Sequence, residues 1–128
     1  MNDPVSVVTK FIETINEGPN GFAKAVAGWF VADSVWENVG MSTTTGPDQA
    51  LGMMQSMAAG GISSIRIENL AVAGHGRTVL TERIDYMLGA DGATKMEVRC
   101  MGAFEVNDAG KIVRWTDYFD TAAFRPKA

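Results

Sequence analysis

The second half of the sequence is built from long segments rich in β-branched and apolar residues, separated by short turn sequences. The segments cover residues 62–72, 77–88, 95–106 and 111–119, and the turns between them are Gly74-His75-Gly76, Gly89-Ala90-Asp91-Gly92 and Asn107-Asp108-Ala109-Gly110. Asp-Gly tolerates the positive φ that tight hairpin turns require. We therefore expect a meander of antiparallel strands.

The N-terminal half predicts the helices that pack against this sheet. Asp3 can cap a helix that begins at Pro4, where the missing N–H of proline has no partner to lose. The apolar residues of this helix recur at helical spacing as Val5, Val8, Phe11, Ile12 and Ile15. Further helices are expected at residues 22–30 and 48–57, with a short strand at 35–39 between them. Helices first and strands second predict an α+β fold with the helices on one face of the sheet.

Length and charge exclude several classes of protein. The 128 residues fit one domain, residues 1–128, and leave no room for a second. The net charge is -4 with no basic cluster, which argues against nucleic acid as a partner. No apolar run approaches the ~18 residues that span a bilayer, so we expect no membrane association.

Cysteine and histidine each occur once. The single Cys100 rules out a disulfide framework, and with an N-terminus unlike a secretory signal it favours a cytoplasmic location. Cys100 is expected to be a buried structural thiol in mid-strand. His75, between two glycines, is expected on a surface turn, and one histidine excludes a histidine-rich metal site. We expect neither a metal nor a cofactor.

One carboxylate falls on an otherwise apolar face of the last predicted strand. By the period-two rule, Asp117 shares its face with Val113, Trp115 and Phe119. Such a carboxylate must be paired, protonated or placed in a pocket, because a bare charge in apolar surroundings costs several kcal/mol. Asp117 is therefore a candidate for a functional site.

A second charged pair lies in residues 77–88. Arg83 and Asp85 share a face with Val79, Thr81 and Met87. Two residues apart on a strand, their side chains start about 7 Å from each other and can form a salt bridge. Both faces of this strand carry apolar residues, so a pair that simply faces water is the alternative.

Three segments resemble limonene-1,2-epoxide hydrolase, a branch of the NTF2-like (SnoaL-like) superfamily. They are Thr81-Glu82-Arg83-Ile84-Asp85-Tyr86, Met101-Gly102-Ala103-Phe104-Glu105-Val106 and Gly110-Lys111-Ile112-Val113-Arg114-Trp115-Thr116-Asp117-Tyr118-Phe119-Asp120. The specific part is Arg-x-Asp followed about thirty residues later by Trp-x-Asp-Tyr-Phe-Asp. The resemblance implies a cone-shaped fold, with helices packed on a strongly curved mixed or antiparallel sheet that encloses an apolar pocket.

The resemblance also implies a chemistry. Asp85 would be the general acid that protonates the epoxide oxygen, and Asp117 the general base that takes a proton from the attacking water. Arg83 would bridge both carboxylates, and Asn38 would help to hold the water. One protonated and one ionised carboxyl group provide push and pull together. The implied activity is cofactor-independent opening of an apolar epoxide, possibly cyclic or terpene-like, to a vicinal diol in one step.

One position departs from the family pattern. Where the family has a tyrosine that also binds the water, this chain has Trp36, whose indole N–H donates a hydrogen bond but accepts none. Trp36 would either hold the water from one side or prevent its binding. The expected pocket lining is Trp115, Met87, Leu51, Met54 and Phe124, each of which core packing would explain equally well. The resemblance further implies a homodimer formed through the outer face of the sheet.

Two other functions remain open at this point. A ketosteroid-isomerase-like or polyketide-cyclase-like enzyme would use an aspartate to move a proton beside a carbonyl. The salt bridge between Arg83 and Asp85 argues against it, because an enolate site favours neutral donors. The other alternative is a non-catalytic pocket that binds an apolar small molecule, and Trp36 is the residue that favours it.

Overall fold

A computed structural model describes residues 3–124 of the chain. The helices and strands follow in the order α1 (Pro4–Ile15), α2 (Gly21–Trp29), β1 (Phe30–Asn38), β2 (Ser42–Thr45), α3 (Gly46–Ala59), β3 (Ser64–His75), β4 (Thr78–Leu88), β5 (Thr94–Val106) and β6 (Ile112–Phe119), with a 3₁₀ turn at Thr121–Phe124. The predicted α+β class and the four strands of the second half are confirmed. No helix within residues 3–124 is long and apolar enough to cross a bilayer.

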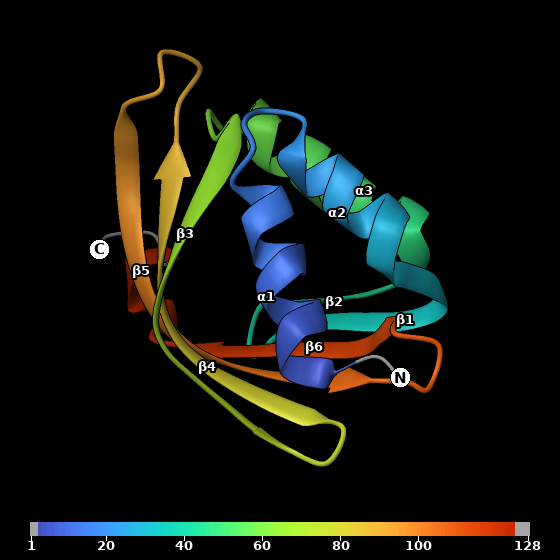
Figure 1. Ribbon diagram of the computed structural model, residues 1–128. Coiled ribbons are helices and arrows are strands. Elements are labelled where there is room, and N and C mark those ends of the chain that lie inside the picture. The colour runs from blue at the N-terminus through green and yellow to red at the C-terminus, as the bar shows by residue number, and fades with distance from the viewer. Residues whose placement is uncertain (1–2, 125–128) are drawn as a thin grey trace.

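The six strands form one open, mixed sheet in the order β2-β1-β6-β5-β4-β3. The parallel pair is β1 with β6, and the other neighbours run antiparallel. Register shifts interrupt several pairs, for example between Asn69 and Ala71 in β3. Such irregularities bend the strands that carry them. Figure 1 shows the result, a strongly curved sheet with α1 on its concave side, where α2 packs against α1 and α3 packs against α2 and over β1 and β2.

The N-terminal helix follows the predicted pattern closely. The Asp3 carboxylate accepts hydrogen bonds from the backbone N–H and the hydroxyl of Ser6 at 3.3 and 2.8 Å. The buried residues of α1 are Val7, Val8, Phe11, Ile12 and Ile15. Asn16, directly after the helix, bonds the backbone of Ile67 in the edge strand β3, donating at 2.8 Å and accepting at 2.7 Å. These two bonds fix the helix against the sheet.

Two details of the chain between α2 and α3 differ from the prediction. The strand β1 begins at Phe30, whereas the sequence predicted a helix to residue 30 and a strand only from residue 35. Residues 31–34 carry no alternation of apolar and polar side chains that would indicate a strand. The short strand β2 was also missed, because its sequence Ser-Thr-Thr-Thr has no apolar residue and lies at the sheet edge.

Aromatic rings fill the centre of the core between α1 and the sheet. Trp115 of β6 stacks against Trp36 of β1 with ring centroids 5.0 Å apart, and against Phe104 of β5 at 5.6 Å. Phe11 of α1 meets Trp115 edge-on at 5.3 Å. Phe22 of α2 packs on Trp36 at 5.3 Å. Because these rings close one end of the concave face, the open space lies beyond them, towards α3.

Candidate active site

A cavity of about 160 Å³ lies between the concave face of the sheet and the helices. Its walls are mostly apolar, as predicted. Among the described residues, those that line it are Ile15, Phe22, Trp36, Asn38, Met41, Ser42, Met53, Met57, Ile65, Ile67, Asp85, Met87, Val98, Cys100, Trp115, Asp117, Phe119 and Phe124. Two carboxylates therefore lie on the wall of an apolar chamber.

Three of the five expected lining residues, Trp115, Met87 and Phe124, are in the cavity wall. The two expected from α3 are not, and this corrects the prediction. All four of these α3 side chains, Leu51, Met53, Met54 and Met57, pack against the hydrophobic core, but only Met53 and Met57 also line the cavity. Residues four positions apart share one face of a helix, so Met53 and Met57 lie one above the other. The sequence pattern selected the neighbouring face of the same helix.

Arg83 joins the two aspartates. It is 0% exposed, and its guanidinium uses all five N–H donors. Its Nε and Nη2 donate to the two oxygens of Asp85 at 3.1 and 2.8 Å. Its Nη1 and Nη2 donate to the two oxygens of Asp117 at 2.9 and 2.8 Å. The fifth bond runs from Nη1 to Thr81 Oγ1 at 3.2 Å. The alternative in which Arg83 and Asp85 face water is wrong.

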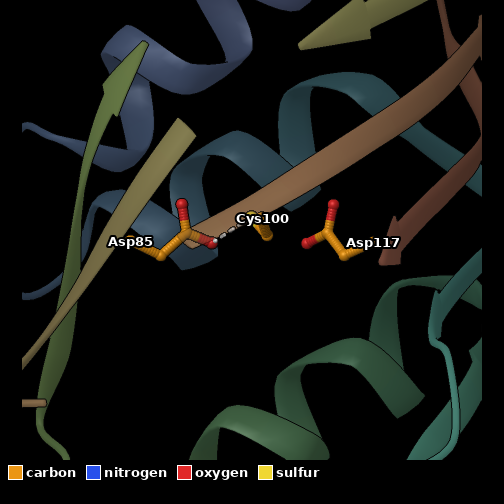
Figure 2. Close-up of side chains that lie close together, drawn as sticks. All are labelled: Asp85, Cys100 and Asp117. Carbon is orange, nitrogen blue, oxygen red and sulfur yellow. Dashed lines mark hydrogen bonds between the residues drawn. The ribbon is translucent and has the colours of Figure 1, made fainter. Parts of the chain in front are cut away.

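The two carboxylates come from β4 and β6, and β5 lies between these strands. Asp85 is 7% exposed and Asp117 is 4% exposed. Figure 2 shows them on either side of Cys100, which belongs to β5. The Sγ of Cys100 lies 3.5 Å from Asp85 Oδ2, within hydrogen-bond distance for a thiol. Trp115 Nε1 donates to Asp117 Oδ1 at 2.8 Å.

Burial and charge act against each other at this site. Burial raises the pKa of the Asp117 carboxyl above its ordinary value, although Arg83 and the Trp115 indole favour the ionised form. Burial alone would lower the pKa of Arg83, but Asp117 and Asp85 raise it well above its ordinary value, so the guanidinium stays charged.

Cys100 was expected to be a buried structural thiol, and the structure refines this expectation. The residue is buried, as predicted, but it also lines the cavity. Burial raises the pKa of its thiol far above the ordinary value, with only partial opposition from Arg83. The group is therefore a neutral thiol at physiological pH, and a thiol is a poor nucleophile.

Asp85, Cys100 and Asp117 also have the residue types and spacing of a metal site, since their ligand atoms lie within 4.8 Å of one another. The Arg83 guanidinium, however, is bound to both carboxylates. It already supplies the positive charge that two adjacent buried carboxylates need. The arrangement is thus that of an Asp-Arg-Asp site, as the sequence indicated.

Asn38 and Trp36 lie beside this group on β1. Asn38 pairs with Asp117 across the parallel β1–β6 ladder, and its Nδ2 donates to Ser42 Oγ at 3.3 Å. Trp36 pairs with Trp115 two positions earlier in the same ladder, so it lies on the same face. Both residues line the cavity. The indole nitrogen of Trp36 is buried and has no hydrogen-bond partner among the described residues, so the contribution of Trp36 to the cavity wall is the surface of its ring.

The sequence pattern placed Thr81 on the same strand face as Arg83 and Asp85 but indicated no function for it. Its hydroxyl is buried and accepts the fifth bond of the guanidinium. The signal that could have identified it is its position two residues before Arg83, because alternate residues of a strand share one face. A buried arginine needs an acceptor for each of its donors, and two carboxylates together left one donor unbound.

Comparisons with known proteins agree with this geometry. Residues 2–125 match the family model described as the limonene-1,2-epoxide hydrolase catalytic domain. The epoxide hydrolase EphG of Mycobacterium tuberculosis is 34% identical over 88 residues, which are 69% of this chain and 56% of that protein. The chain thus spans little more than half the length of this curated relative.

Solved structures of other proteins also resemble this chain. An LEH-like epoxide hydrolase of M. tuberculosis superposes with a TM-score of 0.72 at 28% identity, covering 92% of this chain and 83% of that chain. An NTF2-like protein of unknown function from Burkholderia pseudomallei superposes with a TM-score of 0.77 at 17% identity over 97% of this chain and 95% of that one, which shows a shared fold. The sequence match over residues 2–125, on an NTF2-like cone, shows that this chain belongs to the limonene-1,2-epoxide hydrolase family.

Proposed function

We propose that this protein hydrolyses an apolar epoxide to a vicinal diol in a single step, without a cofactor. The observation that carries the proposal is Arg83, bound to two buried carboxylates on the wall of an apolar cavity. Such a cavity favours an apolar substrate, cyclic or terpene-like, over a charged one. The family to which the chain belongs supports the same reaction class.

The proposed step uses each acid once. The Asp117 carboxylate takes a proton from a water molecule while the oxygen of that water forms a bond to an epoxide carbon. The carbon–oxygen bond of the ring breaks, and its electron pair goes to the epoxide oxygen. Asp85 donates its proton to that oxygen, which yields the diol. One carboxyl group is protonated and the other ionised both before and after the step, so the charge around Arg83 is unchanged.

One observation supports the assignment of the base to Asp117. Asn38, whose amide suits it to hold a water molecule, pairs with Asp117 and not with Asp85. Burial raises the pKa of Asp117, so this carboxyl takes up a proton more readily than an exposed aspartate does. For Trp36 the proposed role is to form the cavity wall beside this water, because its indole nitrogen is enclosed by protein.

The test is the pair of variants Asp117→Asn and Asp85→Asn with a panel of apolar epoxides, measured as diol formation by gas chromatography. Each variant is expected to lower kcat by about 10²–10⁴-fold, the usual contribution of a general acid or base. Circular dichroism spectra like that of the parent would show that the fold is retained. Parent-like turnover by Asp117→Asn would exclude this mechanism.

The same assay separates the alternative functions. A β,γ-unsaturated ketone in the panel tests an isomerase, which the two ion pairs of Arg83 disfavour because an enolate site favours neutral donors over a charged guanidinium. Binding of unaltered epoxides without turnover would indicate a non-catalytic pocket.

We also propose that the protein forms a homodimer through the outer face of its sheet. Leu70, Leu80, Met101 and Tyr118 are 43–49% exposed, although they are large apolar side chains. Their strands β3, β4, β5 and β6 are neighbours, which is the arrangement expected of an interaction surface. Light scattering coupled to size exclusion is expected to give twice the 13.7 kDa mass of one chain, and the double variant with Leu80→Glu and Met101→Glu is expected to give the mass of a single chain. A cytoplasmic location stays a proposal that rests on the single cysteine.

A further inference from the structure

The guanidinium of Arg83 lies over one rung of the sheet. In this rung Thr81 of β4 pairs with Gly102 of β5, and Gly102 pairs with Asp117 of β6. The outer two residues both accept hydrogen bonds from Arg83 Nη1. Gly102, between them, has no side chain, and the guanidinium nitrogen lies where one would begin.

The space above Gly102 is fully occupied. A Cβ atom added there would lie 2.3 Å from Arg83 Nη1, 2.8 Å from Thr81 Oγ1 and 2.9 Å from Asp117 Oδ1. All three distances are shorter than any contact a Cβ normally makes. Gly102 is not among the residues with positive φ, so an alanine would fit the backbone. The position therefore requires glycine for the room above it and not for its conformational freedom.

We propose that Gly102 is a positioning residue of the site: the absence of its side chain, with the Thr81 hydroxyl as anchor, lets one guanidinium bind both carboxylates. The expected effect on catalysis rests on the proposed hydrolase function, whereas the positioning of Arg83 by Gly102 rests on geometry. This geometry also explains which bonds depend on the position. Nη1 carries the bonds to Thr81 and one oxygen of Asp117, Nε holds Asp85, and Nη2 holds one oxygen of each aspartate.

The consequence falls on the base more than on the acid. A Cβ at residue 102 displaces Nη1 and so weakens the contact with Asp117 first. Arg83 lowers the pKa of Asp117 by its charge and its hydrogen bonds, against the effect of burial. The other titratable groups beside Asp117 are Asp85 of β4 and Cys100 of β5. No other strand or helix contributes a titratable side chain to the cavity wall within the described residues.

The variant Gly102→Ala tests the inference, with Gly52→Ala as its matched control. Gly52 lies exposed in α3, and a Cβ there would meet nothing within 4 Å. Gly102→Ala is expected to lower kcat/KM for an apolar epoxide by about a hundredfold, the cost of a misplacement of roughly 1 Å. A carbon-13 titration of the aspartate carboxyls is expected to show a higher pKa for Asp117. Gly52→Ala is expected to match the parent in both measurements.

A second variant decides the question if Gly102→Ala does not fold. Thr81→Val keeps the shape of the side chain and removes only the acceptor of the fifth bond. It is expected to move the Asp117 titration in the same direction by a smaller amount and to lower kcat/KM by about threefold to tenfold. A folded Gly102→Ala, or a Thr81→Val, with the parent's Asp117 titration would overturn the inference. Because the titration needs no substrate, this result stands even if the parent hydrolyses no epoxide.

Discussion

At the scale of single residues, Asp117 is subject to two opposing effects. Burial disfavours its charge, while Arg83 and the Trp115 indole donate three hydrogen bonds to its oxygens. Burial is the larger effect, so the pKa of this carboxyl is raised. A carboxyl group with a raised pKa binds a proton more readily than an exposed aspartate, which suits a general base.

The pH dependence of kcat/KM follows from this shift. The base works only when it is ionised, so the rate falls as the pH drops through the pKa of the site. Because that pKa is raised, the acid limb is expected above the value of about 3.9 typical of aspartate. Initial rates in buffers from pH 4 to 9, with a check that the protein stays folded, measure it. An acid limb at or below the ordinary aspartate value would contradict the assignment.

At the scale of secondary structure, the edge strand β3 is held by one side chain from outside the sheet. Asn16 bonds both the N–H and the C=O of Ile67, groups that no further strand pairs with. It thereby blocks one site of edge-to-edge pairing and connects α1 to the wall of the cavity, since Ile67 also lines it.

The variant Asn16→Ala is expected to lower the free energy of unfolding by about 1–3 kcal/mol, because it leaves two half-buried backbone groups without partners. Urea titration followed by tryptophan fluorescence measures the loss. Asn20→Ala is the control, since Asn20 is exposed and its side chain makes no capping bond at the start of α2. Equal stability of the two variants would show that the bonds to Ile67 contribute nothing.

The sequence predicted those elements whose pattern depends on a single buried face. The strand with Asp117 was placed correctly because Trp115 and Phe119 flank the carboxylate at period two. Strand β2 has no such face, and its threonines form a strand only because β1 offers an edge. In α3, Leu51 and Met54 pack against the core, and Met53 and Met57 do so while also lining the cavity. Apolar residues on more than one face are thus partly buried, and the sequence alone cannot tell which of them line the cavity.

Strand spacing indicated that Arg83 and Asp85 can form a salt bridge, whereas the pairing of Arg83 with Asp117 was predicted through family resemblance. Gly102 belongs to one of the segments that resemble the family, but its role depends on where the guanidinium from the neighbouring strand lies. That is a property of three strands packed together and not of any one of them. Likewise, the bonds of Asn16 to Ile67 join residues far apart in the chain, so no local pattern indicates them.

At the scale of the whole molecule, Arg83 neutralises two buried carboxylates at the centre of the sheet. Removing one member of a buried ionic group leaves the others uncompensated, and this costs more than the pair ever contributed. The stability of the fold should therefore depend on Arg83 to a degree that depends on pH.

The variant Arg83→Met is expected to lower the free energy of unfolding by about 3–5 kcal/mol near neutral pH. Without the guanidinium, burial raises the pKa of the Asp117 carboxyl in the folded state still further above its unfolded value. Such a group destabilises the fold increasingly as the pH rises through that interval, so the deficit should shrink towards pH 5. Denaturation at pH 5 and pH 8 measures it. The control is Arg77→Met, which removes an exposed ion pair with Asp108 and should cost under about 1 kcal/mol at either pH.

Every N–H donor of the guanidinium at the centre of the site is bound to Thr81, Asp85 or Asp117. No donor of Arg83 remains for a molecule bound in the cavity. We therefore expect the apolar cavity walls to select the bound molecule, while Arg83 and the two aspartates act as a separate unit for proton transfer. Evolution, or an engineer, can accordingly exchange Met53, Met57 or Phe124 to admit a differently shaped molecule and leave the acid–base balance of the site as it was.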